Sequence, residues 1–277
     1  MQGTEAGRRF DAAALDGLAG QPAFLAALSA RLQAALAEGQ DMPVRRVHVE
    51  AGPSDLCTRQ DPVDLEGSVF DGPALARLRA CAVSLLGASF LARREVAPIL
   101  VVGTGALATA LARAHAPNAS GAEFLVWGRD EAKAAALAAA VGGRTVSDLA
   151  AAVGQAGRIL VAAGTAAPLL QGTWLKAGTY VELAGANRPD LRSADDQAMR
   201  RAALFADARQ AGLRRAGDLA QTLRKGVIAP DALRADLADL ARGRHPGRQD
   251  GTQITFFLPV GTAFADHVAA RMVMEWA

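Results

Sequence analysis

The sequence predicts an α/β fold built on a doubly wound, parallel sheet. Apolar runs alternate with Ala-rich helical stretches at an interval typical of parallel strands joined by crossover helices, and a glycine-rich turn follows the first run. We expect strands at residues 99–102, 124–127, 159–163, 180–183, 204–206 and 254–258. We expect helices at residues 106–115, 131–141, 146–153, 194–202, 211–225, 231–242 and 261–276.

The first third of the chain has a different pattern. Apolar positions at helical spacing predict two helices within residues 10–38, separated by the Gly-Gln-Pro stretch at 20–22. Residues 43–50 alternate as a strand does, and residues 51–72 are typical of loop or short strand pieces. Residues 73–94 predict a helix with a small-residue face.

The segments on either side of the predicted sheet are too small to be separate domains. We therefore expect residues 1–94 and 246–277 to join into one smaller α+β domain for substrate binding and dimerisation. The dinucleotide-binding domain, residues 95–245, is then inserted in it. The polar stretch at 243–252 reads as a hinge between the two.

Residues 98–129 contain the strand, turn, helix and second strand that a dinucleotide-binding turn of the Rossmann type needs, PILVVGTGALATALARAHAPNASGAEFLVWGR. Gly103 permits a tight turn, Gly105 has no Cβ to keep the backbone from a pyrophosphate, and Ala108 lets the helix pack close. The alternative is an ordinary turn in an Ala-rich protein. The candidate cofactor-binding residues here are Gly103, Thr104, Gly105, Ala106, Leu107 and Ala108.

The end of the second strand bears on the choice of cofactor. Arg129 stands where a 2′-phosphate would lie, and a guanidinium fork suits phosphate. Asp130, one residue later, could instead cap the next helix. We expect NADP(H) to be preferred, with NAD(H) as the alternative; the alternative for Arg129 is a solvated surface residue.

Composition excludes several classes of protein. The 277 residues include 30 basic and 28 acidic side chains for a net charge of +2, without a basic stripe, which argues against nucleic acid. No run of eighteen uncharged apolar residues predicts a membrane span, and the first residues lack a signal-peptide core. Two cysteines give no disulfide framework, which fits a reducing cytoplasm. The four histidines show no metal-ligand spacing, so we expect no metal site.

Several segments in the same order resemble the ornithine cyclodeaminase/mu-crystallin family. The turn GTGALA resembles the family's G-x-G-x-Q-A, with Leu107 at the Gln position. The other segments are PVR at 43–45, DGPALARLRACA at 71–82, PLLQGTWLKAGT at 168–179, GANRPDLR at 185–192, AGDL at 216–219 and ITFFLPVGTA at 254–263. The resemblance implies hydride exchange between a nicotinamide and the Cα of an amino or imino acid. It adds Val260 and Gly261 to the cofactor-binding candidates.

The chain also departs from the family's pattern. The stretch between Arg45 and Asp71 is a few dozen residues shorter than usual, and no lysine precedes Lys133, so the family's substrate-binding lysine is absent. Asn187 stands where the cyclodeaminases have an aspartate that does acid/base work. Because an asparagine cannot relay a proton as a carboxylate does, this favours the ketimine-reductase branch, or a changed or lost activity.

The implied site needs a cation for the substrate carboxylate. Arg45 and Arg79 are the candidate clamps, although each could instead pair with an Asp or Glu, and Arg46 competes with Arg45. Asn187 is the catalytic candidate, able to hydrogen-bond substrate or nicotinamide; the alternative is a turn residue before Arg188.

We therefore expect an NAD(P)H-dependent reductase of cyclic ketimines or imino acids, such as pyrroline- or piperideine-2-carboxylate, which runs reversibly as an amino-acid dehydrogenase. Its partner is a small imino or amino acid, and its assembly a homodimer through the mixed domain. The alternatives are an ornithine cyclodeaminase-type lyase with retained NAD, and a catalytically silent NADPH-binding protein of the mu-crystallin kind.

Overall fold

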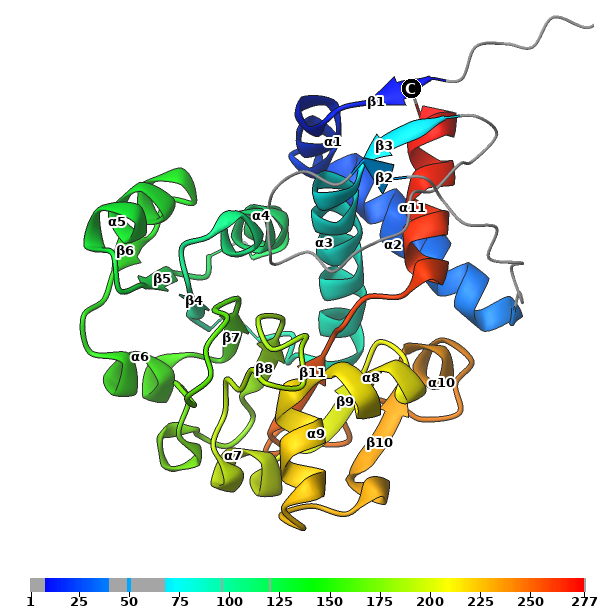
Figure 1. Cartoon of the computed structure of the whole chain (residues 1–277). Helices are drawn as coiled ribbons and strands as arrows, with labels where there is room; N and C mark the ends of the chain where they lie inside the picture. The colour runs from blue at the N-terminus through cyan, green and yellow to red at the C-terminus, as the bar shows by residue number, and fades with distance from the viewer. Residues whose placement is uncertain (1–7, 40–48, 51–67, 96, 120, 277) are drawn as a thin grey trace, which may run out of the picture.

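The computed structural model describes residues 8–39, 49–50, 68–95, 97–119 and 121–276 (Figure 1). Its main feature is an eight-stranded sheet in the order β10-β9-β11-β8-β7-β4-β5-β6, and every strand pair is parallel. The strands are β4 (Ile99–Val102), β5 (Phe124–Trp127), β6 (Arg144–Thr145), β7 (Arg158–Val161), β8 (Tyr180–Leu183), β9 (Ala203–Ala206), β10 (Leu233–Asp236) and β11 (Thr255–Leu258). The predicted fold class, a doubly wound α/β sheet, is confirmed.

The strand order reverses at β4. From β4 the chain adds β5 and β6 on one side, then returns to add β7 and β8 on the other. In open α/β sheets a ligand binds at such a switch point, outside the carboxyl ends of the strands. The glycine-rich turn after β4 lies at that place.

Helices cover both faces of the sheet, which explains why every residue of the central strands β4 and β8 is buried. On one face lie α4 (Ala106–His115) and α5 (Glu131–Ala140), together with α3 (Gly72–Leu91) from the first third of the chain. The other face carries α6 (Leu149–Gln155), α7 (Asp196–Arg201), α8 (Arg209–Arg215) and α9 (Gly217–Arg224).

The remaining helices surround α3, as Figure 1 shows: α1 (Ala12–Ala19), α2 (Pro22–Glu38) and α11 (Ala263–Trp276). A small parallel sheet beside them has the order β1-β3-β2, formed by β1 (Arg9–Phe10), β3 (Val69–Asp71) and β2 (Val49–Glu50). Phe10 and Phe70 stack across it with ring centroids 4.9 Å apart. One apolar core runs from these helices onto Phe257 and Tyr180 of the large sheet, so α3 belongs to both parts.

Among the described residues, α3 is the one helix long and apolar enough to cross a membrane, with a mean hydropathy of 1.5. It is interrupted by Arg77 and Arg79, and 72% of its apolar stretch is buried inside the protein. That burial is what the central helix of a core requires, and it accounts for the hydropathy.

Residues 231–242 correct one expectation, because they do not form a single helix. They contain the end of a short 3-10 turn (Pro230–Ala232), then β10, and α10 (Leu237–Ala241). Leu233 and Ala235 are buried on either side of exposed Arg234, which is the period of a strand and not of a helix. Asp236 then starts α10 through a capping box with Asp239.

Two further boundaries differ from the expectation. The helix expected at 211–225 is two helices, α8 and α9, divided at Ala216, whose backbone is extended. The strand at 254–258, which we assigned to the smaller domain, lies between β8 and β9 in the large sheet. Residues up to Leu258 therefore contribute to the large sheet, and only α11 returns to pack on α3 and α2.

Candidate functional site

The turn after β4 has the backbone that its glycines suggest. Gly103 has φ +119°, and a Cβ there would lie 2.9 Å from the carbonyl oxygen of Ala162 in the turn after β7. Gly105 has an ordinary φ of −78°, and a Cβ there would meet nothing within 4 Å. Gly103 is therefore required by the fold, whereas Gly105 leaves open space in front of the helix.

The start of α4 differs from the starts of three other helices that cover the sheet, α5, α6 and α7. Helices α5, α6 and α7 each begin at an aspartate, Asp130, Asp148 or Asp195, whose carboxylate accepts a backbone N–H of the first turn. Helix α4 begins at Gly105, which supplies no side-chain cap. Its first N–H groups and its helix dipole therefore face the open space, an arrangement that suits a pyrophosphate. Ala108 is fully buried, as close packing of the helix requires.

Glycines also follow two neighbouring strands, at positions where a Cβ would not fit. A Cβ on Gly128, after β5, would lie 2.4 Å from Cγ2 of Thr104. A Cβ on Gly185, after β8, would lie 2.3 Å from the carbonyl oxygen of Ala163. The sequence analysis missed both glycines, and the available signal was their place directly after an apolar run. The residues present at this edge fit a dinucleotide lying on backbone.

Arg129 and Asp130 lie in different situations. Asp130 is occupied as the N-cap of α5, accepting the N–H of Lys133 at 3.1 Å and pairing with its ammonium at 3.1 Å. The side chain of Arg129 is exposed at the end of β5. The structure thus engages the carboxylate of Asp130 in the first turn of α5 and leaves the side chain of Arg129 exposed.

Asn187 lies in a loop after β8 that α9 holds in place. Gly217 donates its N–H to the carbonyl of Ala186 at 2.8 Å, and a Cβ on Gly217 would lie 1.9 Å from the carbonyl oxygen of Leu191. Asn187 is half-buried. The two segments GANRPDLR and AGDL therefore fit together through a contact that only glycine allows.

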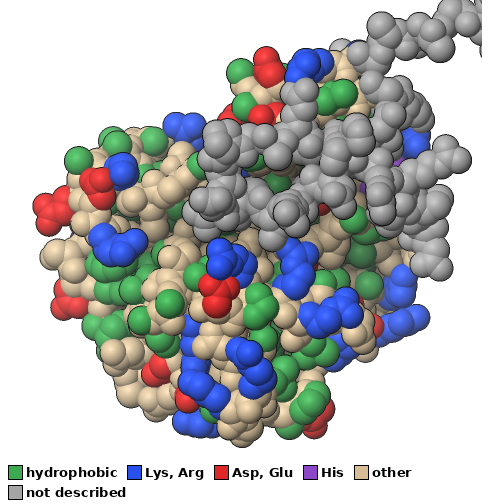
Figure 2. Space-filling model, viewed as in Figure 1, with side chains coloured by type: hydrophobic (Ala, Val, Ile, Leu, Met, Phe, Trp, Pro, Cys, Tyr) green, Lys and Arg blue, Asp and Glu red, His purple; other side chains and the backbone are tan. Residues whose placement is uncertain are grey.

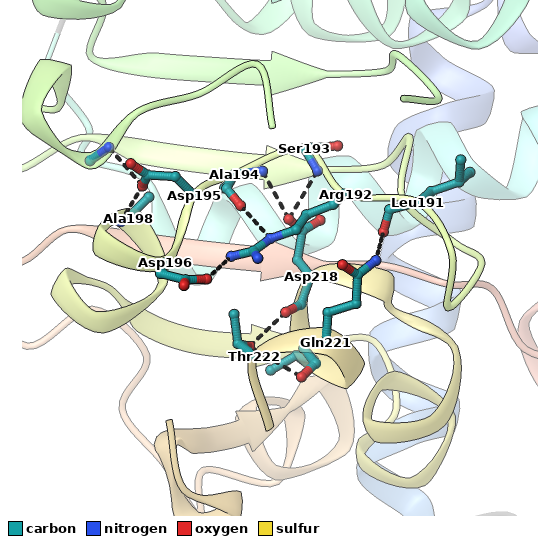
Figure 3. A network of polar contacts seen from close by, with 12 residues as sticks. Leu191, Arg192, Ser193, Ala194, Asp195, Asp196, Ala198, Asp218, Gln221 and Thr222 are labelled. Atoms are coloured by element: carbon teal, nitrogen blue, oxygen red, sulfur yellow. Dashed lines mark hydrogen bonds and ion pairs between the residues drawn. The ribbon is translucent and has the colours of Figure 1, made fainter. Parts of the chain in front are cut away.

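Asp218 is the polar centre of this contact, as Figure 3 shows. Its carboxylate accepts the backbone N–H groups of Ser193 at 3.0 Å and Ala194 at 2.8 Å. Burial raises the pKa of Asp218 to about 6. Gln221, one turn later, donates to the carbonyl of Leu191 at 3.1 Å. Asp218 is thus a structural residue that fixes the loop carrying Asn187.

Arg79, Val260 and Gly261 come together at the end of β11. Asp207 accepts the N–H of Val260 at 3.1 Å and of Gly261 at 2.7 Å. Arg79 donates from Nε to buried Asp266 at 3.0 Å, and its terminal nitrogens lie against Gly261, where a Cβ would be 2.5 Å from Nη2. The pairing of Arg79 with a carboxylate, the alternative to a substrate clamp, is therefore present in the structure.

Further basic groups surround this turn. Arg215 of α8 donates from Nη1 to the carbonyl of Gly261 at 3.3 Å, a contact that the sequence analysis missed. Figure 2 shows Lys and Arg side chains gathered over α8 and α9 on this face.

Two further residues complete the account of this turn. Burial raises the pKa of Asp207, which accepts the two N–H groups. Arg45, the other predicted clamp, falls outside the described residues.

A buried polar line crosses the core between α3, α4 and the sheet. Ser84 donates to Glu182 Oε2 at 2.5 Å and contacts His115 Nε2 at 2.8 Å; Tyr180 also donates to Glu182, at 3.2 Å. The other ring nitrogen of His115 lies 3.0 Å from Nη1 of Arg158. The sequence analysis did not predict this connection between Ser84 and His115.

The protonation states in this line follow from burial. Burial and the charge of Arg158 lower the pKa of His115 to about 3, so the imidazole is neutral and its Nδ1 accepts from the guanidinium. Nε2 then carries the proton and donates to Ser84. Burial raises the pKa of Glu182 to about 7, although hydrogen bonds from Ser84 and Tyr180 act against it.

Among the described residues, no group of three or more His, Cys, Asp or Glu side chains is arranged to hold a metal. Cys81 is buried in α3, and burial raises the pKa of its thiol to about 12.

The chain also matches a family of known proteins. Residues 67–277 match the profile of the ornithine cyclodeaminase/mu-crystallin family. The chain belongs to this family. The resemblance found in the sequence is thereby confirmed.

Relatives within the family are named reductases. The Delta(1)-pyrroline-2-carboxylate reductase of Paracoccus denitrificans is 37% identical over 212 residues, which cover 74% of this chain and 67% of the relative. The ketimine reductase mu-crystallin of Macropus fuliginosus is 30% identical over 210 residues, which cover 75% of this chain and 64% of the relative. This chain thus spans about two thirds of their length.

Two solved structures bear on the fold. Delta(1)-pyrroline-2-carboxylate reductase of Thermococcus litoralis, in complex with NADH and L-proline, superposes with a TM-score of 0.71 at 25% identity, covering 78% of this chain and 68% of that chain. A probable ornithine cyclodeaminase from Bordetella pertussis has a TM-score of 0.76 at 24% identity, covering 97% and 96%. The second likeness is one of fold alone, and it extends over nearly all of both chains.

Proposed function

We propose that this protein is an NAD(P)H-dependent reductase of cyclic ketimines of the pyrroline- or piperideine-2-carboxylate type, reversibly an amino-acid dehydrogenase. The observation that carries the proposal is one sheet edge that combines an open glycine turn with the guanidinium-flanked Val260–Gly261 turn. The two turns follow β4 and β11, which are three strand spacings apart, about 14 Å. The 37% identity to a Delta(1)-pyrroline-2-carboxylate reductase supports the substrate class.

The reaction needs few catalytic groups from the protein. A hydride adds to the imine carbon of the protonated ring, the C=N bond becomes a C–N bond, and the positive charge on nitrogen is neutralised. A nicotinamide supplies that hydride when bound. The chain itself has to hold the carboxylate, orient the ring and exclude water. Arg79 is the proposed carboxylate partner, with its guanidinium oriented by the ion pair to Asp266.

Asn187 fits a reductase better than a lyase. Its amide can donate to and accept from substrate or nicotinamide, but it cannot take a proton and return it. Reduction of an iminium needs no such relay, whereas release of ammonia from ornithine does. The loop fixed by Gly217 and Asp218 keeps Asn187 at the carboxyl end of β8.

NADP(H) is the proposed cofactor, with NAD(H) as the weaker ligand. The support is local: Asp130 is engaged by the first turn of α5, while Arg129 is exposed beside it. We also propose a homodimer through the part of the chain around α11 and the small sheet. Light scattering after gel filtration tests this, and a clean monomer would contradict it.

The decisive experiment follows oxidation of NADPH and NADH with pyrroline-2-carboxylate, piperideine-2-carboxylate and acyclic imino acids. We expect oxidation that depends on a cyclic imine, with no ammonia formed from ornithine. Ammonia without net cofactor turnover would instead establish the lyase. Tight NADPH binding without turnover on any imine would establish a silent binding protein.

A further inference from the structure

A second cavity lies at the opposite edge of the large sheet from the proposed cofactor turn. It has a volume of about 620 Å³ and is bordered by residues where strands begin, including Ile99 of β4, Arg158 of β7 and Gly178 just before β8. The last turn of α3, the end of α4 and part of α2 complete its wall. Nothing in the proposed reaction uses this cavity.

The described lining is strongly basic. Four cations line it, Arg93, Arg94, Arg158 and Lys176, against one carboxylate, Glu95, which pairs with Arg93. Four positive charges and one negative charge leave three positive charges. His115 adds none, because its imidazole is neutral. Four cations around one cavity, with a single carboxylate among them, make its electrostatic potential positive, and this favours an anion.

Arg158 is the clearest member of this group. Its side chain is partly buried, and burial lowers its pKa. Among the described residues its side-chain hydrogen-bond partner is the neutral ring of His115 at 3.0 Å, and the buried Glu182 attracts it without a direct contact. A guanidinium has five N–H donors in a planar fork. Most of that fork is therefore available to a ligand in the cavity.

The other cations differ in how far they are engaged. Nε of Arg93 is buried without a partner, and exposed Arg94 has no ion-pair partner in the part of the chain described. Lys176 donates to the carbonyl of Gln155, which uses one of its three N–H groups. The last carbonyl of α3, that of Leu91, accepts hydrogen bonds from Arg248 and Thr255. The cations that line the cavity are therefore not needed to cap this helix end.

We propose that this cavity is a binding site for a small multivalent oxyanion, a di- or tricarboxylate or a phosphate compound, separate from the cofactor and substrate site. The volume suits a metabolite-sized ligand, and the three unbalanced positive charges suit an anion with two or three negative charges. Bidentate contacts from Arg158 and Arg94 provide the recognition. The proposal does not depend on the proposed function.

The site also has a built-in reporter. Arg158 contacts His115, His115 contacts Ser84, and Ser84 donates to Glu182 in β8. An anion on Arg158 offsets the positive charge beside His115, so the resonances of that ring move when the cavity fills. A neighbouring cavity of about 440 Å³, lined by Arg200, Arg201 and Arg234, has its own histidine, His245. The two histidines distinguish the two cavities.

The test titrates citrate and inorganic pyrophosphate by calorimetry at constant ionic strength, with the protein saturated with dinucleotide so that the pyrophosphate turn is occupied. We expect a dissociation constant of about 1 mM or tighter for at least one anion. Arg94→Ala and Arg158→Gln should each weaken binding at least about five-fold, which is about 1 kcal/mol. Arg113→Ala is the matched control: Arg113 is exposed on α4, the helix that carries His115, but does not line the cavity, so the variant should bind as the wild type does.

Binding of citrate alone would identify a carboxylate site, and binding of pyrophosphate alone a phosphate site. Histidine NMR of the wild type should show the His115 resonances moving on titration, and this readout does not depend on the folding of any variant. No binding of either anion, or binding equal to wild type in Arg94→Ala and Arg158→Gln, would overturn the proposal. So would movement of the His245 resonances with His115 unchanged.

Discussion

The two edges of the large sheet differ in the groups that line them: glycine backbone at the carboxyl edge and basic side chains at the amino edge. At the carboxyl edge, Gly103, Gly128 and Gly185 leave no room for a Cβ, and Gly105 faces open space. At the amino edge, the cavity is bordered by the long side chains of arginines and a lysine. One edge therefore offers backbone N–H groups at fixed positions, and the other offers flexible charges. Substituting a larger residue for a glycine should therefore impair the carboxyl edge, and removing a basic side chain should impair the amino edge.

The largest effect is expected from Gly103→Val. Its φ of +119° is a conformation that β-branched residues avoid, and the new Cβ would lie 2.9 Å from the carbonyl oxygen of Ala162. We expect the free energy of unfolding to fall by about 3 kcal/mol, measured by urea denaturation. Dinucleotide binding should be lost as well. Wild-type stability in this variant would contradict the backbone seen at the carboxyl edge.

Glu182→Gln tests the polar line between the two edges. Burial raises the pKa of Glu182 from 4.5 to about 7, so the folded state holds this proton more tightly than the unfolded chain. The resulting stabilisation is present in full below about pH 4.5 and is lost as the pH rises through about 7. The variant lacks the titrating group, so it should lose less stability than the wild type over that range.

Between pH 4.5 and pH 8, the wild type should lose on the order of 3 kcal/mol more of its free energy of unfolding than Glu182→Gln does. Urea unfolding at several pH values measures this difference. Tyr180→Phe sharpens the result, because it removes a donor 3.2 Å from the carboxylate and should raise the pKa of Glu182 further. Identical pH slopes for Glu182→Gln and the wild type would show that the carboxyl group is not held as the structure has it.

Local pattern was enough to predict the carboxyl edge. The strands 99–102, 124–127 and 180–183 and the helix 106–115 have the predicted boundaries, because each is a short run whose period and flanking residues agree. The positive φ of Gly103 and the capping role of Asp130 follow from residue type and position. Such features depend on neighbours in the sequence.

The rest depended on contacts between distant residues. No local signal places residues 255–258 between β8 and β9, because strand order is decided by the packing of whole elements. The line from Arg158 through His115 and Ser84 joins residues more than thirty positions apart. Asp266 as the partner of Arg79 is 187 positions away. Sequence patterns could suggest each residue, but not which others it meets.

Gly105→Ala isolates binding from stability at the carboxyl edge. Its φ of −78° suits any residue and the new Cβ meets nothing within 4 Å, so the free energy of unfolding should stay the same or rise by about 0.5 kcal/mol. The methyl group would occupy the space next to the pyrophosphate, so dinucleotide affinity should fall at least about ten-fold, or about 1.4 kcal/mol. Fluorescence titration with NADPH measures it.

Gly17→Ala is the matched control, because its Cβ also meets nothing within 4 Å and it lies in α1, away from the turn. Its NADPH affinity should equal that of the wild type. Unchanged affinity in Gly105→Ala would mean that no pyrophosphate approaches this turn.

The smallest effect concerns Arg129, the long side chain that is proposed to contact the 2′-phosphate of the cofactor. Arg129→Ala should weaken NADPH binding by about 1–2 kcal/mol and leave NADH binding within two-fold, since only NADPH carries the 2′-phosphate that a guanidinium grips. Titration of both dinucleotides into the variant and the wild type gives the ratio. Arg144→Ala, on β6 in an exposed ion pair with Glu123, controls for loss of surface charge. Should the preference for NADPH survive in Arg129→Ala, Arg129 would not be the residue that selects NADPH, and the proposed contact with the 2′-phosphate would be wrong.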